Sequence, residues 1–190
     1  DSVSVRILSV FFGHKGPVND CAFSPDGRSV ISAGSDLALN LWNLANLDSI
    51  PESKRERGGL CVFSPDGTLV ASAKDTAIEL LDSGDLHVVN SFSAHTEHVT
   101  ACAFSPDGRR IVSSSTGKSI FIWETASCKP VRELEEHTTS VPSCAYSPDG
   151  KYILSAAGVK IQGWNATTGQ ALRTLTDHIF YVNALSFSPD

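Results

Sequence analysis

The sequence predicts an all-β fold built from four-stranded antiparallel sheets in tandem, and three observations support this prediction. First, a turn phrase of an aromatic residue followed by Ser-Pro-Asp recurs at intervals of 40, 41, 42 and 41 residues, which is typical of a repeat architecture. Second, the short runs between the turns, such as ALNLW and SIFIW, have the length and alternation of strands. Third, four strands with four short connections fill about 40 residues. The aromatic positions are Phe23, Phe63, Phe104, Tyr146 and Phe187.

The repeated phrase has the chemistry of a tight reverse turn. Proline at its second position presets the backbone angle of a type I turn, and the aspartate side chain caps the turn backbone. Glycine follows in four copies and accepts the left-handed conformation that leads back into a strand. Each phrase therefore marks a hairpin between two strands, and successive sheets are expected to stack radially, face on face.

The individual strands follow in chain order. Residues 3–12 are rich in β-branched and aromatic residues and are expected to form a first strand. Residues 43–59 are expected to be irregular, because Pro51 and a charged run at residues 54–57 disfavour a strand. The other predicted strands are 18–23, 29–33, 37–42, 60–63, 69–73, 77–81, 87–92, 99–104, 110–114, 119–123, 130–134, 141–146, 152–156, 159–164 and 171–175, with a further one beginning at residue 181.

Composition and charge narrow the classes of function. The 190 residues carry a net charge of −6, which disfavours sequence-independent binding of nucleic acid. No apolar run approaches the roughly 20 residues of a membrane helix, so no membrane partner is expected. Four of the five cysteines lie two residues before a turn aromatic, and none has the Cys-x-x-Cys spacing of a zinc site. Cys21, Cys61, Cys102 and Cys144 are therefore expected as small apolar side chains on buried strands in a reducing compartment, the cytoplasm, with the nucleus as the alternative.

These residues resemble the WD40 repeat, which builds β-propellers. The marks are a Gly-His-like pair ten residues before the turn serine, the turn itself, and a Trp-Asp-like pair at the end of the third strand. The resemblance covers essentially the whole chain. It implies a fragment of a WD40-type β-propeller with four four-stranded antiparallel blades, a lone N-terminal outer strand and a lone C-terminal inner strand. The second blade is expected to be degenerate, with an irregular or three-stranded junction before it.

The resemblance also implies a hydrogen-bonded set of His, Ser or Thr, Asp and Trp in each blade. Such a set can rigidify a blade, because the buried indole N–H and the imidazole both find partners. The second repeat departs most, with Lys54 at the His position and Leu81 at the Trp position. In the third and fourth repeats, Gly117 and Gly158 stand near the Asp position. The expected members are His14, Ser32, Asp36 and Trp42; Ser72; His95, Ser113 and Trp123; and His137, Ser155 and Trp164.

The repeat register also gives the expected units. Residues 1–13 are the outer strand of a preceding blade, and residues 178–190 are the first strand of a following blade. The resemblance implies that a ring closes by completing one blade from both ends, and the middle strands of that blade would be absent here. The chain is therefore expected to be a piece of a longer propeller, which in the family's usual form has about seven blades. The four blades between are 14–53, 54–94, 95–136 and 137–177.

The predicted function is that of a non-catalytic scaffold that binds other proteins or peptides, with no cofactor and no metal. No Gly-x-Ser-x-Gly elbow occurs, and the histidines are spaced as repeat marks. By the resemblance, partners dock on the face that carries the outer-to-inner connections and the turns between second and third strands. The candidates on this face are Lys15, Leu37, Lys54, Arg55, Thr76, Glu97, His98, Lys118, Thr138, Val159, Phe180 and Tyr181.

Two other classes of function stay open at this point. One is an RNA-binding or ribonucleoprotein propeller, which a contiguous basic patch near Lys15 and residues 54–57 would favour. The other is the sensory or autoinhibitory propeller of a larger nucleotide-binding signalling ATPase, whose chemistry would lie elsewhere. A propeller hydrolase is disfavoured, because no convergent set of carboxylates or metal ligands is evident. Oligomeric state is not predicted.

Overall fold

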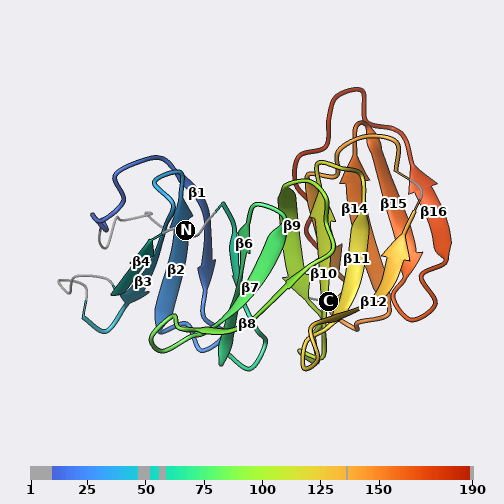
Figure 1. Cartoon of the computed structure of the whole chain (residues 1–190). Coiled ribbons are helices and arrows are strands. Elements are labelled where there is room, and N and C mark those ends of the chain that lie inside the picture. Colours follow the sequence, from blue (N-terminus) through green and yellow to red (C-terminus); the bar gives the residue numbers. More distant parts are fainter. Residues whose placement is uncertain (1–9, 47–51, 56–58, 136, 189–190) are drawn as a thin grey trace, which may run out of the picture.

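The computed structural model describes residues 10–46, 52–55, 59–135 and 137–188, with the backbone alone for residues 52–55. Within these ranges the fold is all-β, as the sequence predicts. Four antiparallel sheets follow one another across the molecule in chain order (Figure 1). Each contains four strands that are neighbours both in sequence and in space, so every sheet is a simple meander.

The strand bounds are as follows. The first sheet contains β1 (Val18–Phe23), β2 (Ser29–Gly34), β3 (Ala38–Asn43) and β4 (Glu52–Arg55). The second contains β5 (Cys61–Phe63), β6 (Leu69–Lys74), β7 (Ala77–Asp82) and β8 (Val88–Ser93). The third contains β9 (Val99–Phe104), β10 (Arg110–Ser115), β11 (Ile120–Glu124) and β12 (Lys129–Leu134). The fourth contains β13 (Ser143–Tyr146), β14 (Tyr152–Ala157), β15 (Lys160–Asn165) and β16 (Ala171–Leu175).

The repeated turn has the predicted geometry. In the second sheet, the Ser64 hydroxyl donates to Asp66 Oδ1 at 2.6 Å, and the Gly67 N–H donates to the Ser64 carbonyl at 2.9 Å. Gly67 has φ 75°, in the left-handed region that favours glycine. A Cβ placed on Gly67 would lie 3.5 Å from the ring of Pro25 in the preceding turn, so consecutive turns lie against one another.

The core lies between consecutive sheets rather than inside any one of them. Leu39 of the first sheet and Val70 of the second belong to one buried cluster. Ile78 and Trp123 join the second sheet to the third, and Ile120 and Ile153 join the third to the fourth. Each sheet thus buries its apolar faces only against its neighbours, which is how repeat architectures are stabilised.

The irregular junction predicted for residues 43–59 is wrong. Glu52–Arg55 form β4, which pairs antiparallel with β3 and gives the first sheet its fourth strand. Lys54 and Arg55 therefore belong to the first sheet, and the second sheet has four strands without them. Strand pairing uses backbone groups, and an edge strand tolerates charged side chains because one side of it faces solvent.

The lone strands predicted at the two ends do not form in the described residues. Val10–Phe12 lie outside any strand, while residues 3–9 of the predicted first strand fall outside the described ranges. The Phe11 ring instead packs on Trp42, with centroids 4.9 Å apart. Residues 181–188 also form no strand, although Val182 is buried. Within the described ranges no strand lies alongside either segment to form a ladder with it.

The cysteine prediction holds for only part of the set. Cys61 and Cys144 are buried between sheets, Cys102 is half-buried, and all five cysteines are free thiols. Cys21 is exposed, contrary to the prediction, because no described residue covers that face of β1. Phe23 on the same face is 69% exposed for the same reason. The described part of the chain contains no helix of the length and apolar character needed to cross a membrane.

Candidate interaction face and the sets behind it

The first sheet brings together all four residues of its predicted hydrogen-bonded set. The Trp42 indole N–H donates to Ser32 Oγ at 2.8 Å, and Ser32 Oγ lies 2.8 Å from His14 Nε2. His14 Nδ1 lies 3.0 Å from Asp36 Oδ1. Donors and acceptors alternate along this chain when His14 carries its proton on Nδ1, since Ser32 then donates to Nε2. The set ties the segment before β1 to β2, β3 and the turn between them.

Asp36 is the anchor of this set. Besides His14, its carboxylate accepts the backbone N–H of Lys15 at 2.6 Å and that of Ala38 at 3.3 Å. These hydrogen bonds, with the Lys15 N–H first, lower the pKa of Asp36 to about 2. Gly34 is required beside the set, because a Cβ there would collide with Asp36 Oδ1 and His14 Nδ1.

The third sheet forms an equivalent set with a substitute that the sequence reasoning missed. Trp123 donates to Ser113 Oγ at 2.8 Å, and Ser113 Oγ lies 2.7 Å from His95 Nε2. Gly117 stands near the Asp position, but Ser119 Oγ lies 2.8 Å from His95 Nδ1 and takes the acceptor role. A serine two residues beyond the expected position was the only signal in the sequence.

The fourth and second sheets keep smaller sets. In the fourth, Ser155 Oγ accepts from the Trp164 indole at 2.8 Å and lies 2.6 Å from His137 Nε2. In the second, Lys54 does not occupy the His place, because it lies in β4 opposite Leu39. There the Ser72 hydroxyl donates to the Leu60 carbonyl at 3.0 Å, so a backbone group replaces the missing imidazole.

These sets support one face of the molecule, here called the loop face: the segments before β1, β5, β9 and β13, the segment after β16, and the turns between second and third strands. Backbone hydrogen bonds join these segments across sheets. The Val99 N–H donates to the Asp75 carbonyl at 2.8 Å, and the Val141 N–H donates to the Ser115 carbonyl at 3.1 Å. The Val182 N–H donates to the Gly158 carbonyl at 2.8 Å. The loop face is therefore continuous from the second sheet to the segment after β16.

The predicted partner-binding residues occupy this face to different degrees. Thr76 is half-buried, and the side chains of Lys54 and Arg55 lie outside the described structure. The backbone of these two residues lies in β4, opposite Leu39 and Ala38, rather than in a connecting loop. The exposed members are Lys15, Leu37, Glu97, His98, Lys118, Thr138, Val159, Phe180 and Tyr181.

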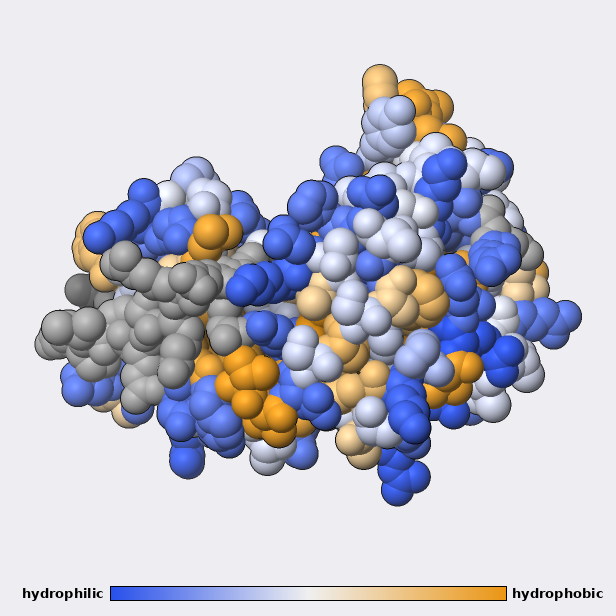
Figure 2. Space-filling view, viewed as in Figure 1, coloured by the Kyte–Doolittle hydropathy of each residue, from blue (hydrophilic) through white to orange (hydrophobic). Residues whose placement is uncertain are grey.

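The segment after β16 carries the most prominent hydrophobic side chains on the loop face. Ile179, Phe180 and Tyr181 are 84%, 78% and 77% exposed. Figure 2 shows hydrophobic side chains projecting at the top of the view, where the loop that follows β16 lies in Figure 1. A second feature is a crevice lined by Leu37, Asp75 and His98, which come from the first three repeats.

Comparison with known proteins decides the family. The family described as "WD domain, G-beta repeat" matches three segments of the chain, residues 5–43, 86–124 and 128–159. Together these segments make up more than half of the chain. The chain belongs to the WD40 repeat family. The WD40 matches leave out residues 44–85, where Leu81 stands at the Trp position and the Leu60 carbonyl takes the place of the histidine.

The curated WD40 relatives are longer than the matched region. An uncharacterized WD repeat-containing protein of Synechocystis is 34% identical over 129 residues, which cover 66% of this chain and 36% of that protein. Human pre-mRNA-processing factor 17 is 32% identical over 124 residues, 63% of this chain and 21% of that protein. A probable cytosolic iron-sulfur protein assembly protein 1 of Cryptococcus neoformans is 28% identical over 111 residues, 58% of this chain and 24% of that protein. The match thus spans between about a fifth and about a third of each relative.

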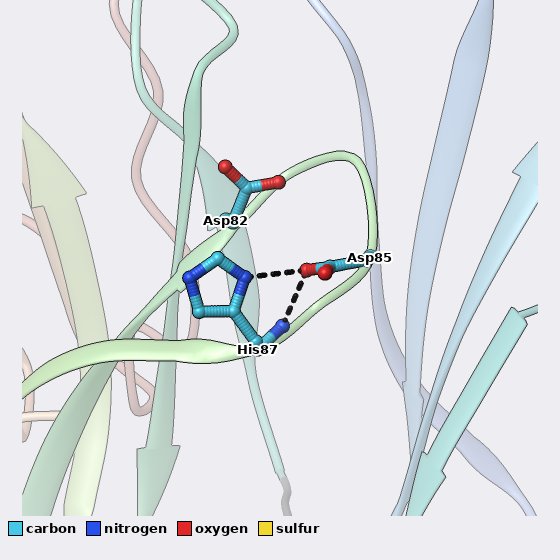
Figure 3. Close-up of side chains that lie close together, drawn as sticks. All are labelled: Asp82, Asp85 and His87. Atoms are coloured by element: carbon cyan, nitrogen blue, oxygen red, sulfur yellow. Dashed lines mark hydrogen bonds and ion pairs between the residues drawn. The ribbon is translucent and has the colours of Figure 1, made fainter.

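One group of metal-ligating side chains lies outside the WD40 sets, in the turn between β7 and β8. Ligand atoms of Asp82, Asp85 and His87 lie within 4.8 Å of one another (Figure 3). Asp82 Oδ1 accepts the Gly84 N–H at 2.8 Å. Asp85 Oδ1 accepts the His87 N–H at 2.9 Å and lies 2.6 Å from His87 Nδ1. These hydrogen bonds close the turn and account for the arrangement without a bound ion.

The buried histidine of the third WD40 blade, His95, leads to a prediction about pH. Burial lowers the pKa of His95 to about 4, below its ordinary value of 6.5. Between pH 6.5 and 4 the imidazole of His95 is therefore protonated in the unfolded state but neutral in the folded state. Protonation favours the unfolded state, so stability is lost as pH falls from about 6.5 to 4. We expect the free energy of unfolding to drop by about 1–2 kcal/mol between pH 7.5 and 5 from this residue.

Urea denaturation at the two pH values measures this effect in the wild type and in His95→Gln. The glutamine variant is less stable at pH 7.5, yet it is expected to lose less stability on acidification. An equal loss in both proteins would contradict the assignment. His87→Gln serves as the control, because His87 is exposed.

Proposed function

We propose that this WD40 chain is a non-catalytic scaffold that binds a partner protein or peptide on its loop face. The observation that carries the proposal is the exposed trio of Ile179, Phe180 and Tyr181 at the edge of a face held together by backbone hydrogen bonds. Exposed aromatic residues are enriched among those that dominate binding energy. A rigid support adds affinity, because little conformational entropy is lost when the partner docks.

The attachment of this trio supports a defined docking element rather than a loose tail. The neighbouring Val182 is buried with Ala156 and Ile161 of the fourth sheet. The Val182 N–H donates to the Gly158 carbonyl, and the Leu185 N–H donates to Ser143 Oγ at 3.1 Å. The aromatic side chains thus project from a segment that is anchored directly after them.

The test is co-purification with the intact protein that contains this chain. Partners recovered with the wild type are expected to fall at least about tenfold with the double variant Phe180→Ser, Tyr181→Ser. The thermal unfolding midpoint is expected to change little, because both side chains are exposed. Tyr152→Ser is the matched control, since Tyr152 is an exposed aromatic on β14 away from this segment. Recovery of the same partners by both variants would refute this face as the docking surface.

A ribonucleoprotein role is the second candidate, and one observation favours it: the similarity to a protein named as a pre-mRNA-processing factor. The net charge of −6 weighs against direct contact with RNA. Protein-mediated membership of such a particle is compatible with the scaffold proposal. The salt dependence of binding distinguishes direct RNA binding from protein docking. The affinity for RNA would fall steeply between about 50 and 200 mM salt, whereas the affinity for a partner docked on the apolar trio would not. We place the protein in the cytoplasm, a proposal supported by the relative named as cytosolic.

A further inference from the structure

The face opposite the loop face carries the Ser-Pro-Asp turns, and a crevice there lies between the third and fourth blades. Arg109, Arg110, Asp107, Tyr146 and Asp149 are among the residues that line it. The corresponding crevice between the first and second blades is lined by no basic residue. A crevice between the second and third blades shares Asp107 and Arg109. Of these three crevices, the one between the third and fourth blades is the one lined by Arg110 and Tyr146.

Tyr146 contains a buried polar group without a partner. It is the only tyrosine among the five turn aromatics, the others being phenylalanine. The residue is 9% exposed, and its hydroxyl is buried without a hydrogen bond in the described part of the chain. Burial raises the pKa of this hydroxyl, and the charge of Arg110, which lines the same crevice, opposes the rise. Buried hydroxyls normally have partners, so this one is short of an acceptor or a donor.

Arg110 supplies hydrogen-bond donors to the same crevice. Its Nη1 donates to the Ala166 carbonyl at 3.1 Å, which holds the guanidinium across the crevice from β10 to the turn after β15. A guanidinium has five N–H donors, so most of them remain available. Within the described residues, neither Arg110 nor the neighbouring Arg109 forms an ion pair with a carboxylate.

The carboxylates of the crevice are already engaged by donors of their own turns. Asp107 Oδ1 accepts the Ser105 hydroxyl at 2.6 Å and the Arg109 N–H at 3.1 Å. Asp149 accepts the Ser147 hydroxyl at 2.6 Å and pairs with Lys151 Nζ at 3.2 Å. Neither carboxylate forms an ion pair with Arg109 or Arg110 within the described residues, so the two guanidinium groups remain open to an acceptor from a partner.

We propose that this crevice binds a single carboxylate of a partner peptide, held by the Arg110 guanidinium and the Tyr146 hydroxyl. A planar carboxylate matches the guanidinium fork and accepts one further hydrogen bond from a phenol. A phosphate dianion fits less well, because Asp107 and Asp149 lie on the same crevice and repel the second charge. The carboxylate can come from an acidic side chain or from a chain end. This inference does not rest on the loop face.

The repeat itself provides the variants that test the proposal. Tyr146→Phe introduces the residue that Phe63 and Phe104 already provide in the other turns, and Arg110→Leu introduces the residue found at Leu69. Both variants are therefore expected to fold. Tyr146→Phe is expected to leave the unfolding midpoint unchanged or higher, because it removes a hydroxyl that has no partner. The matched control is Arg28→Thr, which alters the position equivalent to Arg109 in the first repeat and introduces the residue found at Thr68.

Binding is measured by fluorescence anisotropy on the intact protein with three labelled hexapeptides. One has a single Glu with both ends capped, one has Gln in its place with both ends capped, and one is the Gln peptide with a free C-terminus. The capped Glu peptide or the free C-terminal peptide is expected to bind at least about tenfold tighter than the capped Gln peptide. Which of the two binds identifies the source of the carboxylate.

Each variant of the crevice is expected to weaken that binding about tenfold or more, while Arg28→Thr leaves it unchanged. Equal binding of all three peptides, or wild-type affinity in both crevice variants, would overturn the proposal. Competition by inorganic phosphate at the peptide's own concentration range would indicate a general anion site and overturn it as well. The Phe180→Ser, Tyr181→Ser variant is expected to bind the peptide normally, so failure here and failure of the proposed function are distinguishable.

Discussion

Trp123→Ala is expected to lower the free energy of unfolding by about 3–5 kcal/mol, the largest effect predicted for a single side chain. The Trp123 side chain is 1% exposed and packs on Phe92 of the second sheet and Phe121 of its own, with ring centroids 4.7 and 5.4 Å away. Alanine would leave a cavity between two sheets and remove the only indole donor to Ser113. Urea denaturation followed by circular dichroism measures the loss.

A leucine at the same position is the informative control. In the second sheet Leu81 already occupies the Trp position and is fully buried, so an apolar side chain alone can complete the packing there. Trp123→Leu is expected to cost clearly less than Trp123→Ala, because it fills part of the cavity. Equal losses would mean that the hydrogen bond to Ser113, rather than the packing, dominates at this position.

Asp36→Ala is expected to lower the free energy of unfolding by about 2–3 kcal/mol at pH 7. The substitution leaves His14 Nδ1 and the backbone N–H groups of Lys15 and Ala38 without their acceptor. The counterpart in the third sheet, Ser119→Ala, is expected to cost only about 0.5–1.5 kcal/mol, because it removes a neutral hydrogen bond. Thermal or urea unfolding of the two variants compares a charged acceptor with a neutral one.

The lowered pKa of Asp36 also predicts how the stability of the protein changes at acid pH. The folded-state pKa of Asp36, about 2, lies below the ordinary 3.8, so the unfolded state binds more protons between these values. Its contribution is fully present above pH 4 and is lost as pH falls towards 2. The wild type is therefore expected to lose more stability than Asp36→Ala over this range. A parallel loss in both proteins would show that Asp36 does not act as described.

Local chemistry was enough to locate the strands. β1, β9 and β16 begin and end where the sequence predicts, and most others differ by one or two residues. The first and second strands of each sheet flank a turn whose proline, aspartate and glycine act within four residues of one another. Where this local signal was weak the prediction failed. Glu52–Arg55 are charged and were expected to be irregular, yet they pair with β3 because its edge was free to accept them.

The hydrogen-bonded sets, too, could be predicted only in part from the sequence. Register placed His95, Ser113 and Trp123 together, but it did not find Ser119, which replaces the aspartate from a position two residues further along. Nor did it find the Leu60 carbonyl that takes the place of a histidine beside Ser72. Both substitutes act because of where their atoms lie in space, and the spacing of a repeat does not specify that.

The sequence by itself determined the repeat period, the strand order and the family, because turn formation and strand alternation depend on residues that are close along the chain. Only the tertiary structure showed which faces are covered, as with exposed Cys21 and buried Cys61. It alone brought Tyr146 together with Arg110, which lies 36 residues earlier on another blade. The physical reason is that contacts between sheets join residues about 40 positions apart, and the geometry of two packed faces decides which of their atoms meet.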